Sequence, residues 1–321
     1  MALYLTEADV ERLLDMPTAL EAVEEGFRLL GEEKAQNQPR RRVRGGESIL
    51  HFMAAGAPDL GSAGRGATAV KVYTTSKKGV RFTVLLYDDD GTPIAVIQAN
   101  RLGQIRTGAA SGVATRHLSR EDSREVAIIG TGWQARSQLQ AVVAVRPVER
   151  VRAYGRDEDR RRAFCREMES ALGVSVEPSA SAEECVKGAD ILITATKSKD
   201  PVLLGEWLRP GMHVNAVGSN WHNRRELDTE AVLACHRVTV DTLEVVQLEA
   251  GDLILPVSEG VFSWDKVEEL GEIVADKRPG RESEDQITLF CSQGLALEDV
   301  AVSRRIYDRA REEGVGSEIE P

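Results

Sequence analysis

The chain has 321 residues, a length that predicts about two domains, and its 42% hydrophobic and 29% charged residues are typical of soluble globular proteins. Its net charge of -11 argues against nucleic acid as the main partner, because phosphate contacts need a basic face. The apolar runs are far shorter than the roughly 20 residues of a membrane-spanning helix, and no basic flank precedes an apolar stretch at the start. We therefore expect neither a membrane segment nor a signal peptide.

The cysteine and histidine residues form no metal-binding pattern. The four cysteines are scattered without a C-x-x-C pair, and the five histidines never fall four residues apart on one predicted helix. We expect no metal site, no disulfide framework and a reducing cytoplasm as the compartment.

The first third of the chain is predicted to combine helices with an antiparallel sheet. Residues 1–31 contain two helical patterns, the first with a capping box of Thr6 and Asp9 and the second capped by Asp15. A basic stretch, Arg40–Arg44, comes next. Strand patterns then follow at residues 49–53, 67–73, 82–87 and 94–97. Asp90-Gly91 indicates a hairpin between the last two strands.

The pattern changes near residue 120 to alternating short strands and helices. The predicted strands are 125–129, 150–154, 174–176, 191–194 and 212–217. Such alternation predicts a parallel sheet with helices on both faces, and residues 287–313 look mostly helical. We expect an α/β protein with a Rossmann-type doubly wound parallel sheet at 121–294 and an α+β domain at 1–120, to which residues 295–321 return.

The strongest motif is G-x-G-x-x-A at residues 130–135, between a predicted strand and a predicted helix. Gly130 permits the tight turn, Gly132 lets a pyrophosphate approach the backbone, and Ala135 keeps the helix close to the sheet. The free N–H groups of the helix then face the phosphates. We interpret the motif as a dinucleotide site; the alternative is a glycine-rich turn between core elements.

The end of the second strand of this sheet bears on the choice of cofactor. Gly155 and Arg156 occupy the position where an acidic residue would bind the ribose 2′-hydroxyl of NAD, and an Arg there suits a 2′-phosphate. NADP(H) is therefore favoured. NAD(H) stays possible, with Asp157 selecting it and Arg156 solvated.

Three sets of cations are candidates for a site that binds a small carboxylate. Arg106 begins a helix rich in small residues, and strand alternation places Lys71 on the face opposite Val70 and Val72. If both meet the basic stretch at 40–44 in one pocket, they would bind a carboxylate, to which Arg contributes bidentate contacts. The alternative is that these side chains are solvated or pack in a tight helix.

Taken together, these motifs resemble the ornithine cyclodeaminase/μ-crystallin family, which also contains archaeal-type alanine dehydrogenases and ketimine reductases. The resemblance covers nearly the whole chain. The motifs are Ala-Val-Lys-Val (69–72), Asp-Asp-Gly-Thr-Pro (89–93), Arg-Thr-Gly-Ala-Ala-Ser (106–111), Ile-Ile-Gly-Thr-Gly-Trp-Gln-Ala (128–135), Lys-Gly-Ala-Asp-Ile-Leu (187–192), His-Val-Asn-Ala-Val-Gly-Ser-Asn (213–220), Arg-Glu-Leu-Asp (225–228) and Gln-Ile-Thr-Leu-Phe-Cys-Ser-Gln-Gly-Leu-Ala-Leu-Glu-Asp (286–299).

The resemblance implies a homodimer with a Rossmann domain and a mostly N-terminal domain that binds substrate and dimerises. It implies that Lys71 and Arg106 hold the substrate carboxylate, with a further Arg from 40–42, for which Arg41 and Arg42 are favoured. It places Val217, Gly218 and Ser219 near the nicotinamide. The predicted cofactor site is completed by Thr107, Thr131, Gln134 and Thr196.

One position departs from the cyclodeaminase pattern. The catalytic Asp of ornithine cyclodeaminases corresponds to Asn220, which cannot accept a proton as a carboxylate does. Asp228, in the Arg-Glu-Leu-Asp motif, is expected to be structural. Reduction of a preformed imine demands less of the protein, since the cofactor supplies the hydride.

The sequence therefore predicts an NAD(P)-dependent oxidoreductase acting on the Cα–N bond of a small amino or imino acid. Ketimine reduction, as of Δ1-pyrroline-2-carboxylate, and an alanine dehydrogenase-like reaction both fit. Lys71, Arg106 and Asn220 are the expected catalytic residues. Two alternatives are an ornithine cyclodeaminase, with Asp228 or another acid replacing the missing Asp, and a retired enzyme that binds NADP(H) without turnover.

Overall fold

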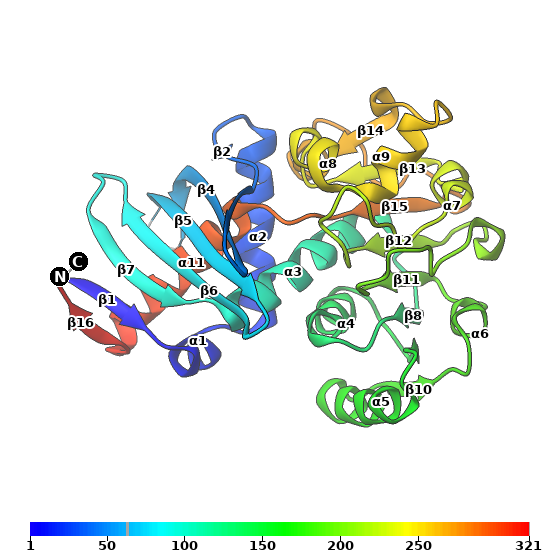
Figure 1. The fold of residues 1–321 in the computed structure, drawn as a ribbon, viewed down its shortest axis with the longest axis horizontal. Coiled ribbons are helices and arrows are strands. Elements are labelled where there is room, and N and C mark those ends of the chain that lie inside the picture. Colours follow the sequence, from blue (N-terminus) through cyan, green and yellow to red (C-terminus); the bar gives the residue numbers. More distant parts are fainter. Residues whose placement is uncertain (62–63, 321) are drawn as a thin grey trace. The chain divides into compact units, whose positions relative to one another are not determined.

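The computed structural model describes residues 1–61 and 64–320, which divide into two compact units (Figure 1). Unit 1 comprises Met1–Ala110 and Gly294–Pro321, and unit 2 comprises Ser111–Gln293. The chain leaves unit 1 within helix α3 (Asn100–Leu118) and returns to it after strand β15 (Thr288–Cys291). The mixed α/β class expected from the sequence is confirmed.

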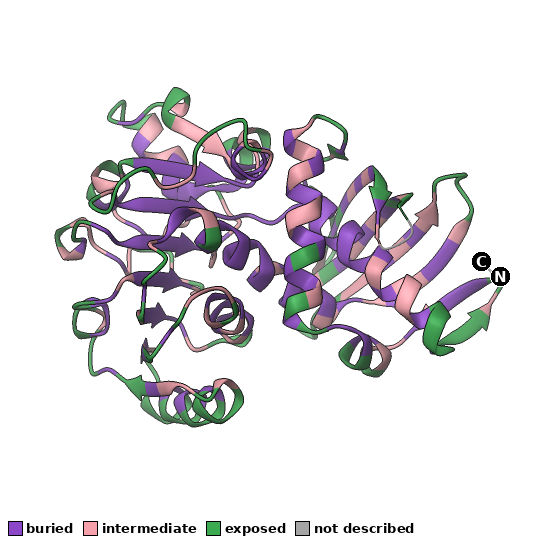
Figure 2. Ribbon diagram, turned by 180° about the vertical axis from the view of Figure 1, so that it is seen from behind, coloured by how far each residue is buried: buried purple, intermediate pink, exposed green. Residues whose placement is uncertain are grey.

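Unit 1 is built on an eight-stranded sheet with helices on one face. Its remaining elements are β1 (Ala2–Leu5), α1 (Glu7–Leu13), α2 (Met16–Gly31), β2 (Gln36–Asn37), β3 (Arg41–Gly45), β4 (Ser48–Leu60), β5 (Arg65–Ser76), β6 (Gly79–Asp88), β7 (Pro93–Gln98), α11 (Ala296–Glu313) and β16 (Ser317–Ile319). The strand order is β16-β1-β7-β6-β5-β4-β2, with β3 paired to β4. Helix α11 packs against β4, β5 and β6, and α2 packs against α11 (Figures 1 and 2).

Local signals explain the helices at the start of unit 1. The capping box of Thr6 and Asp9 is present, and the Asp15 side chain accepts a hydrogen bond from Thr18 N. The expectation of helix alone over 1–31 was incomplete, because Ala2–Leu5 forms a strand. This strand pairs in parallel with β7, a partner about 90 residues away in sequence that no local pattern indicates.

Unit 2 is a parallel eight-stranded sheet. Its remaining elements are β8 (Glu125–Ile129), α4 (Trp133–Val145), β9 (Arg150–Tyr154), α5 (Glu158–Leu172), β10 (Ser175–Pro178), α6 (Ala182–Val186), β11 (Ile191–Thr194), a 3-10 turn (Gly205–Trp207), β12 (His213–Ala216), α7 (Thr229–Ala234), β13 (Arg237–Val240), α8 (Leu243–Glu249), α9 (Gly251–Ser258), a 3-10 turn (Trp264–Lys266), β14 (Val267–Glu269) and α10 (Leu270–Val274). The strand order is β10-β9-β8-β11-β12-β15-β13-β14, and all pairs are parallel. This is the Rossmann-type sheet that the sequence predicts.

Two buried clusters hold the helices of unit 2 to the sheet. One contains Val126, Ile128 and Leu139, and the other contains Ala127, Leu192 and Val214. Because alternate residues of β8 enter different clusters, both faces of this strand are covered. The prediction of mostly helix over 287–313 was wrong for Thr288–Cys291, which forms a fully buried strand between β12 and β13.

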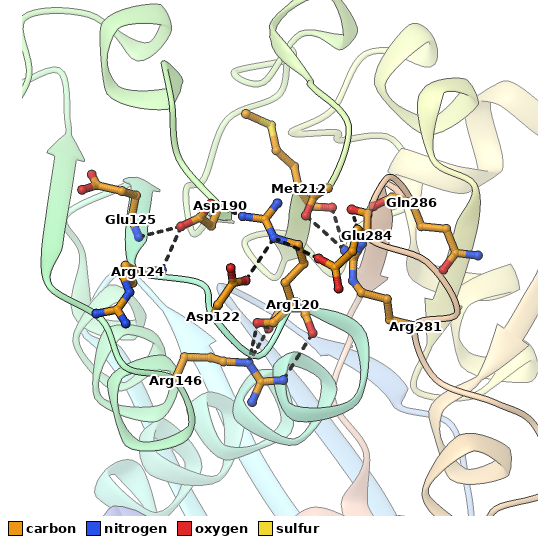
Figure 3. Close-up of polar contacts among 12 residues, drawn as sticks. Arg120, Asp122, Arg124, Glu125, Arg146, Asp190, Met212, Arg281, Glu284 and Gln286 are labelled. Atoms are coloured by element: carbon orange, nitrogen blue, oxygen red, sulfur yellow. Dashed lines mark hydrogen bonds and ion pairs between the residues drawn. The ribbon is translucent and has the colours of Figure 1, made fainter.

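Two arginines, Arg146 and Arg281, cap the C-terminal end of α3 inside unit 2. Figure 3 shows their further contacts, with Arg120 O and with Met212 O and Gln286 O respectively. Arg146 donates hydrogen bonds to the backbone oxygens of Thr115 and Arg116. Arg281 donates from its backbone N to His117 O and from its side chain to Leu118 O. The four carbonyls that a helix end leaves unpaired are all satisfied here.

Two further findings concern the described part of the chain. None of its helices is long and apolar enough to cross a membrane. Within residues 1–61 and 64–320, no three His, Cys, Asp or Glu side chains are grouped as a metal ion would require.

Candidate functional site

Lys71 lies on the buried face of β5, under helix α11. Along this strand Lys71 and Tyr73 are buried while Val70 and Val72 are partly exposed, as the alternation predicts. The Lys71 side chain is 2% exposed, and its Nζ donates to Asp299 Oδ1 at 2.7 Å. Nζ also lies 5.0 Å from the centre of the Phe82 ring. A Lys this deeply buried requires a charged partner, and Asp299 supplies it.

Arg106, on α3, shares this partner. Its Nε donates to Asp299 Oδ1 at 3.2 Å, and its Nη1 donates to Glu298 Oε2 at 2.6 Å. One oxygen of Asp299 therefore binds both Lys71 and Arg106. Residue 294 is glycine where a Cβ would lie 2.5 Å from Arg106 Nη1, so this position leaves space for the guanidinium.

Both carboxylates belong to the first turn of α11, and that placement follows from local capping. Glu298 Oε1 accepts from Leu295 N at 3.0 Å, while Oε2 binds Arg106. Glu298 thus fixes the start of the helix and the arginine together, and neighbouring Asp299 faces Lys71. This pair of acids was missed in the sequence, although both residues close the Gln286–Asp299 motif.

The electrostatics of this cluster favour a partly deprotonated lysine. Burial and nearby Arg106 lower the pKa of Lys71 to about 8, while Asp299 opposes the shift. Burial, with Arg42 and Arg40, lowers the pKa of His51 to about 4, so His51 is neutral at pH 7. Arg40 also contributes to the lowering of the Lys71 pKa.

The register of β3, β4 and β5 decides which arginine of the basic stretch faces Lys71. Arg42 pairs with His51, and His51 pairs with Tyr73, so these side chains share the face of Lys71. Arg41 pairs with Phe52 on the opposite face and is exposed. The structure therefore does not bring Arg41 to the cluster, and the cations placed there are Arg42 and the buried Arg40.

In unit 2 the glycine-rich turn has the geometry that close approach requires. Gly130 adopts φ +117°, and a Cβ there would lie 2.4 Å from Ala195 O. Gly132 caps α4, and a Cβ on it would meet no atom within 4 Å among the described residues, so space is open at the helix N-terminus. Ala135 is fully buried against the sheet.

The first residue after β9 is Gly155, so no acidic side chain stands there. Gly155 faces Thr131, whose Oγ1 would lie 2.6 Å from a Cβ at residue 155, so a larger residue there would require the Thr131 side chain to move. Asp157 caps α5 and accepts from Arg160 N at 3.0 Å. Arg156 is exposed beside it.

The remaining predicted cofactor residues occupy the loops after β11 and β12, with two exceptions. Thr196 follows β11, while Val217, Gly218, Ser219 and Asn220 follow β12. Ser219 is buried, and no described residue gives its hydroxyl a hydrogen-bond partner, as expected where a ligand binds.

The exceptions are Gln134, in the first turn of α4, and Thr107. Thr107 lies in unit 1, where its hydroxyl donates to Gly103 O at 2.7 Å.

Glu226 and Asp228 both serve the structure of these loops. The Glu226 carboxylate accepts from Thr196 N and Gly218 N, and burial raises its pKa to about 7. The Asp228 carboxylate caps α7 through Ala231 N and also accepts from Gly205 N. The structural role expected of Asp228 agrees with these contacts, whereas Glu226 was missed.

These residues fit a dinucleotide. The open helix N-terminus at Gly132, the positive φ of Gly130 and the orphaned Ser219 hydroxyl all lie at the carboxyl ends of parallel strands. In doubly wound sheets this edge receives the ligand, where the strand order reverses beside β8. The fold and the two sets of residues define a two-unit protein of the dinucleotide-binding dehydrogenase class.

Comparison with known proteins narrows the class to one family. The family model for the ornithine cyclodeaminase/mu-crystallin family matches residues 2–314. The chain belongs to this family, as its motifs predict.

Three relatives illustrate the range of similarity. A Delta(1)-pyrroline-2-carboxylate reductase from Bacillus cereus is 42% identical over 246 residues, which cover 76% of this chain and 75% of the relative. The solved structure of Thermococcus litoralis Delta(1)-pyrroline-2-carboxylate reductase with NADH and L-proline superposes with a TM-score of 0.93 at 38% identity, covering 99% and 100% of the two chains. An archaeal alanine dehydrogenase, described as a dimer with bound NAD, gives a TM-score of 0.92 at 34% identity and 99% coverage of both chains.

Proposed function

We propose that this protein is an NAD(P)-dependent oxidoreductase that reduces the C=N bond of a small cyclic imino acid, such as Δ1-pyrroline-2-carboxylate. The observation that carries the proposal is the buried cluster of Lys71, Arg106 and Asp299 in a chain whose other unit has a dinucleotide turn. The reductases from Bacillus cereus and Thermococcus litoralis support the choice of substrate.

The cations of unit 1 would hold the substrate carboxylate. Arg106 offers the planar donors of its guanidinium, and Lys71 offers the compact charge of its ammonium group. Both lie beside the same oxygen of Asp299, Oδ1. Arg42 and Arg40, on the Lys71 face, would add a third and a fourth cation. A buried cluster of cations binds a carboxylate far more strongly than a surface cation does, because water competes less.

Reduction of an imine also requires a proton on the substrate nitrogen. The nicotinamide supplies the hydride when it is bound. Lys71, with a pKa near 8, is a suitable acid at neutral pH. We assign Asn220 the role of a hydrogen-bonding partner for the substrate nitrogen or for a water, since its amide cannot take up a proton.

The same proposal favours NADP(H) over NAD(H). Residue 155 is glycine and offers no carboxylate, and Asp157 is already engaged as a helix cap. Arg156 then stands at the strand end as the candidate for a 2′-phosphate. Changing Arg156 to Ala should raise KM for NADPH about tenfold and leave KM for NADH within twofold; equal KM values for NADPH in both proteins would contradict the assignment.

A homodimer is part of the proposal. The sheet face of unit 1 opposite α11 exposes Val43, Leu50 and Phe52, and nearby a pocket of about 850 Å³ is lined by residues that include Ala54, Val70 and Tyr87. Exposed apolar patches of this kind mark protein interfaces. The archaeal alanine dehydrogenase described as a dimer supports a second copy as the occupant.

The four free cysteines support a cytoplasmic location.

A substrate panel tests the activity. The purified protein should oxidise NADPH with Δ1-pyrroline-2-carboxylate and much more slowly with pyruvate plus ammonia. Formation of proline and ammonia from L-ornithine would contradict the proposal and favour a cyclodeaminase. Tight NADPH binding without turnover of any imino or amino acid would favour a binding protein.

A further inference from the structure

Glu226 is a fully buried carboxylate of unit 2 that the proposed chemistry does not use. It lies between β12 and α7, and its backbone is anchored on both sides. Glu226 O accepts from Val202 N and Leu203 N, and Glu226 N donates to Asp252 Oδ1 at 2.7 Å. The base of this side chain is therefore held rigidly by the surrounding core.

The two carboxylate oxygens each bind a different loop. Oε1 accepts from Thr196 N at 2.6 Å, directly after β11, and Oε2 accepts from Gly218 N at 2.8 Å, directly after β12. Residue 218 is glycine where a Cβ would lie 2.4 Å from Oε2, so a larger residue would displace the carboxylate. One side chain thus joins two loops separated by more than 20 residues in sequence.

These loops lie at the carboxyl ends of neighbouring strands on one side of β8. The first loop continues the wall of the phosphate turn, because Ala195 O lies against Gly130. In a doubly wound sheet the strands on one side of the switch point bind the adenosine half of a dinucleotide, and those on the other side bind the second half. The glycine turn and β9 belong to the first side, and the two joined loops belong to the second.

We propose that Glu226 is a positioning residue that holds the loops after β11 and β12 in the conformation that receives the nicotinamide half of the cofactor. The inference rests on the proposed function, since it requires a nicotinamide dinucleotide. It assigns the adenosine half to contacts that Glu226 does not touch. It therefore predicts that the two halves of the cofactor respond differently when Glu226 is changed.

Glu226→Gln is the direct test, because it keeps the shape of the side chain and replaces one acceptor oxygen with a donor that faces an amide N–H. The dissociation constants of NADH and NADPH are measured by fluorescence titration, and each is compared with its fragment, ADP-ribose or 2′-phospho-ADP-ribose, by calorimetry. Affinity for the better of the two dinucleotides should fall about tenfold or more. Affinity for its fragment should stay within twofold.

The controls separate positioning from loss of the fold. Glu230→Gln, the same chemical change at an exposed site on α7, should leave all the affinities unchanged. Glu226→Asp keeps the charge but is one methylene too short to reach both Thr196 N and Gly218 N, and it should reproduce the split; it carries the test if Glu226→Gln does not fold. Equal weakening of dinucleotide and fragment, or no weakening of either, would overturn the role of Glu226. Wild-type protein that binds neither would instead overturn the proposed function, and with it this role.

Discussion

Lys71 carries an amino group into a part of unit 1 that solvent hardly reaches, and a single carboxylate oxygen makes this possible. Asp299 Oδ1 binds Lys71 Nζ at 2.7 Å and Arg106 Nε at 3.2 Å. Burial and Arg106 lower the pKa of Lys71 by more than Asp299 raises it, so the pKa falls to about 8. A lysine of this kind can bind a carboxylate and release a proton near neutral pH.

Removal of the amino group should abolish turnover and spare the cofactor site. We expect Lys71→Met, which keeps the length and apolar stem of the side chain, to lower kcat/KM for the imine at least 100-fold, as loss of both a charge contact and an acid would. The dissociation constant of NADPH should stay within twofold, because the glycine turn belongs to unit 2. Lys78→Met, the same change at an exposed turn position, is the matched control. Retained turnover in Lys71→Met would remove Lys71 from the reaction.

The pH dependence of the reaction should report the same lysine. An acid must be protonated to act, so kcat/KM for imine reduction should fall as pH rises through about 8. Asp299 is the group that raises the pKa of Lys71, so Asp299→Asn should move this fall to lower pH. Comparing the two profiles between pH 6 and 10 removes the titration of the substrate, which is common to both. An unshifted profile in Asp299→Asn would contradict the assignment.

At the scale of elements, the C-terminal end of α3 depends on side chains from distant elements. Arg146, after α4, donates to the carbonyls of Thr115 and Arg116, and Arg281 donates to those of His117 and Leu118. The positive charges of these arginines also interact favourably with the negative, C-terminal end of the helix dipole. The arrangement anchors a helix that begins in unit 1 and ends in unit 2.

Arg146→Ala should therefore destabilise the protein. It removes the hydrogen bonds that Arg146 donates to the carbonyls of Thr115, Arg116 and Arg120 and to the Ser119 hydroxyl, a loss of about 2 kcal/mol. For a unit of this size the midpoint of thermal unfolding should fall by roughly 5 °C in a calorimetric scan. Arg162→Ala, which removes an exposed ion pair with Glu158 on α5, should change it by about 1 °C or less. Equal effects of the two variants would contradict the capping role.

Elements were predictable where the signal is local. The caps of α1 and α2 and the glycine turn before α4 depend on residues within four positions of one another, and all three are present. The strand Thr288–Cys291 was missed, because a short, fully buried apolar run looks the same in a helix and in a central strand.

The site was predictable only in part for a related reason. Lys71 and Arg106 carry their own charge in motifs, but the choice between Arg41 and Arg42 depends on strand register, and a shift of one residue exchanges the faces. Glu226 binds Gly218 N, Glu298 binds Arg106 and Asp299 binds Lys71, at separations of 8, 192 and 228 residues along the chain. Such contacts leave no trace in local patterns.

At the scale of the whole molecule, no helix among the described residues of unit 1 covers one face of its sheet. Helices α2 and α11 lie on the other face, where Lys71 is buried (Figures 1 and 2). The open face carries Phe52, which is 38% exposed, and Val43, which is 54% exposed. A second copy of the chain would remove this apolar surface from water, which favours association.

Phe52→Glu should disrupt that association. The change removes the apolar contact of the ring and places a carboxylate where association would strip its water, a cost that cross-strand Arg41 offsets only in part, so the dimer should dissociate to monomers at micromolar concentration. Light scattering after size-exclusion chromatography measures the mass directly, against 35.1 kDa for one chain. Glu47→Gln, in the exposed turn before β4, is the control and should leave the dimer intact. A wild-type mass of one chain would contradict the dimer itself.

The most direct test of the central claim follows the hydrogen that is transferred. NADPH carrying deuterium at C4 of the nicotinamide, prepared in each of its two stereochemical forms, is incubated with the protein and Δ1-pyrroline-2-carboxylate. Mass spectrometry of the product should show proline with one deuterium at Cα from one of the two forms, in equal amount to the cofactor oxidised. Oxidation of the cofactor without labelled proline, or absence of proline with both forms, would contradict hydride transfer to the imine carbon.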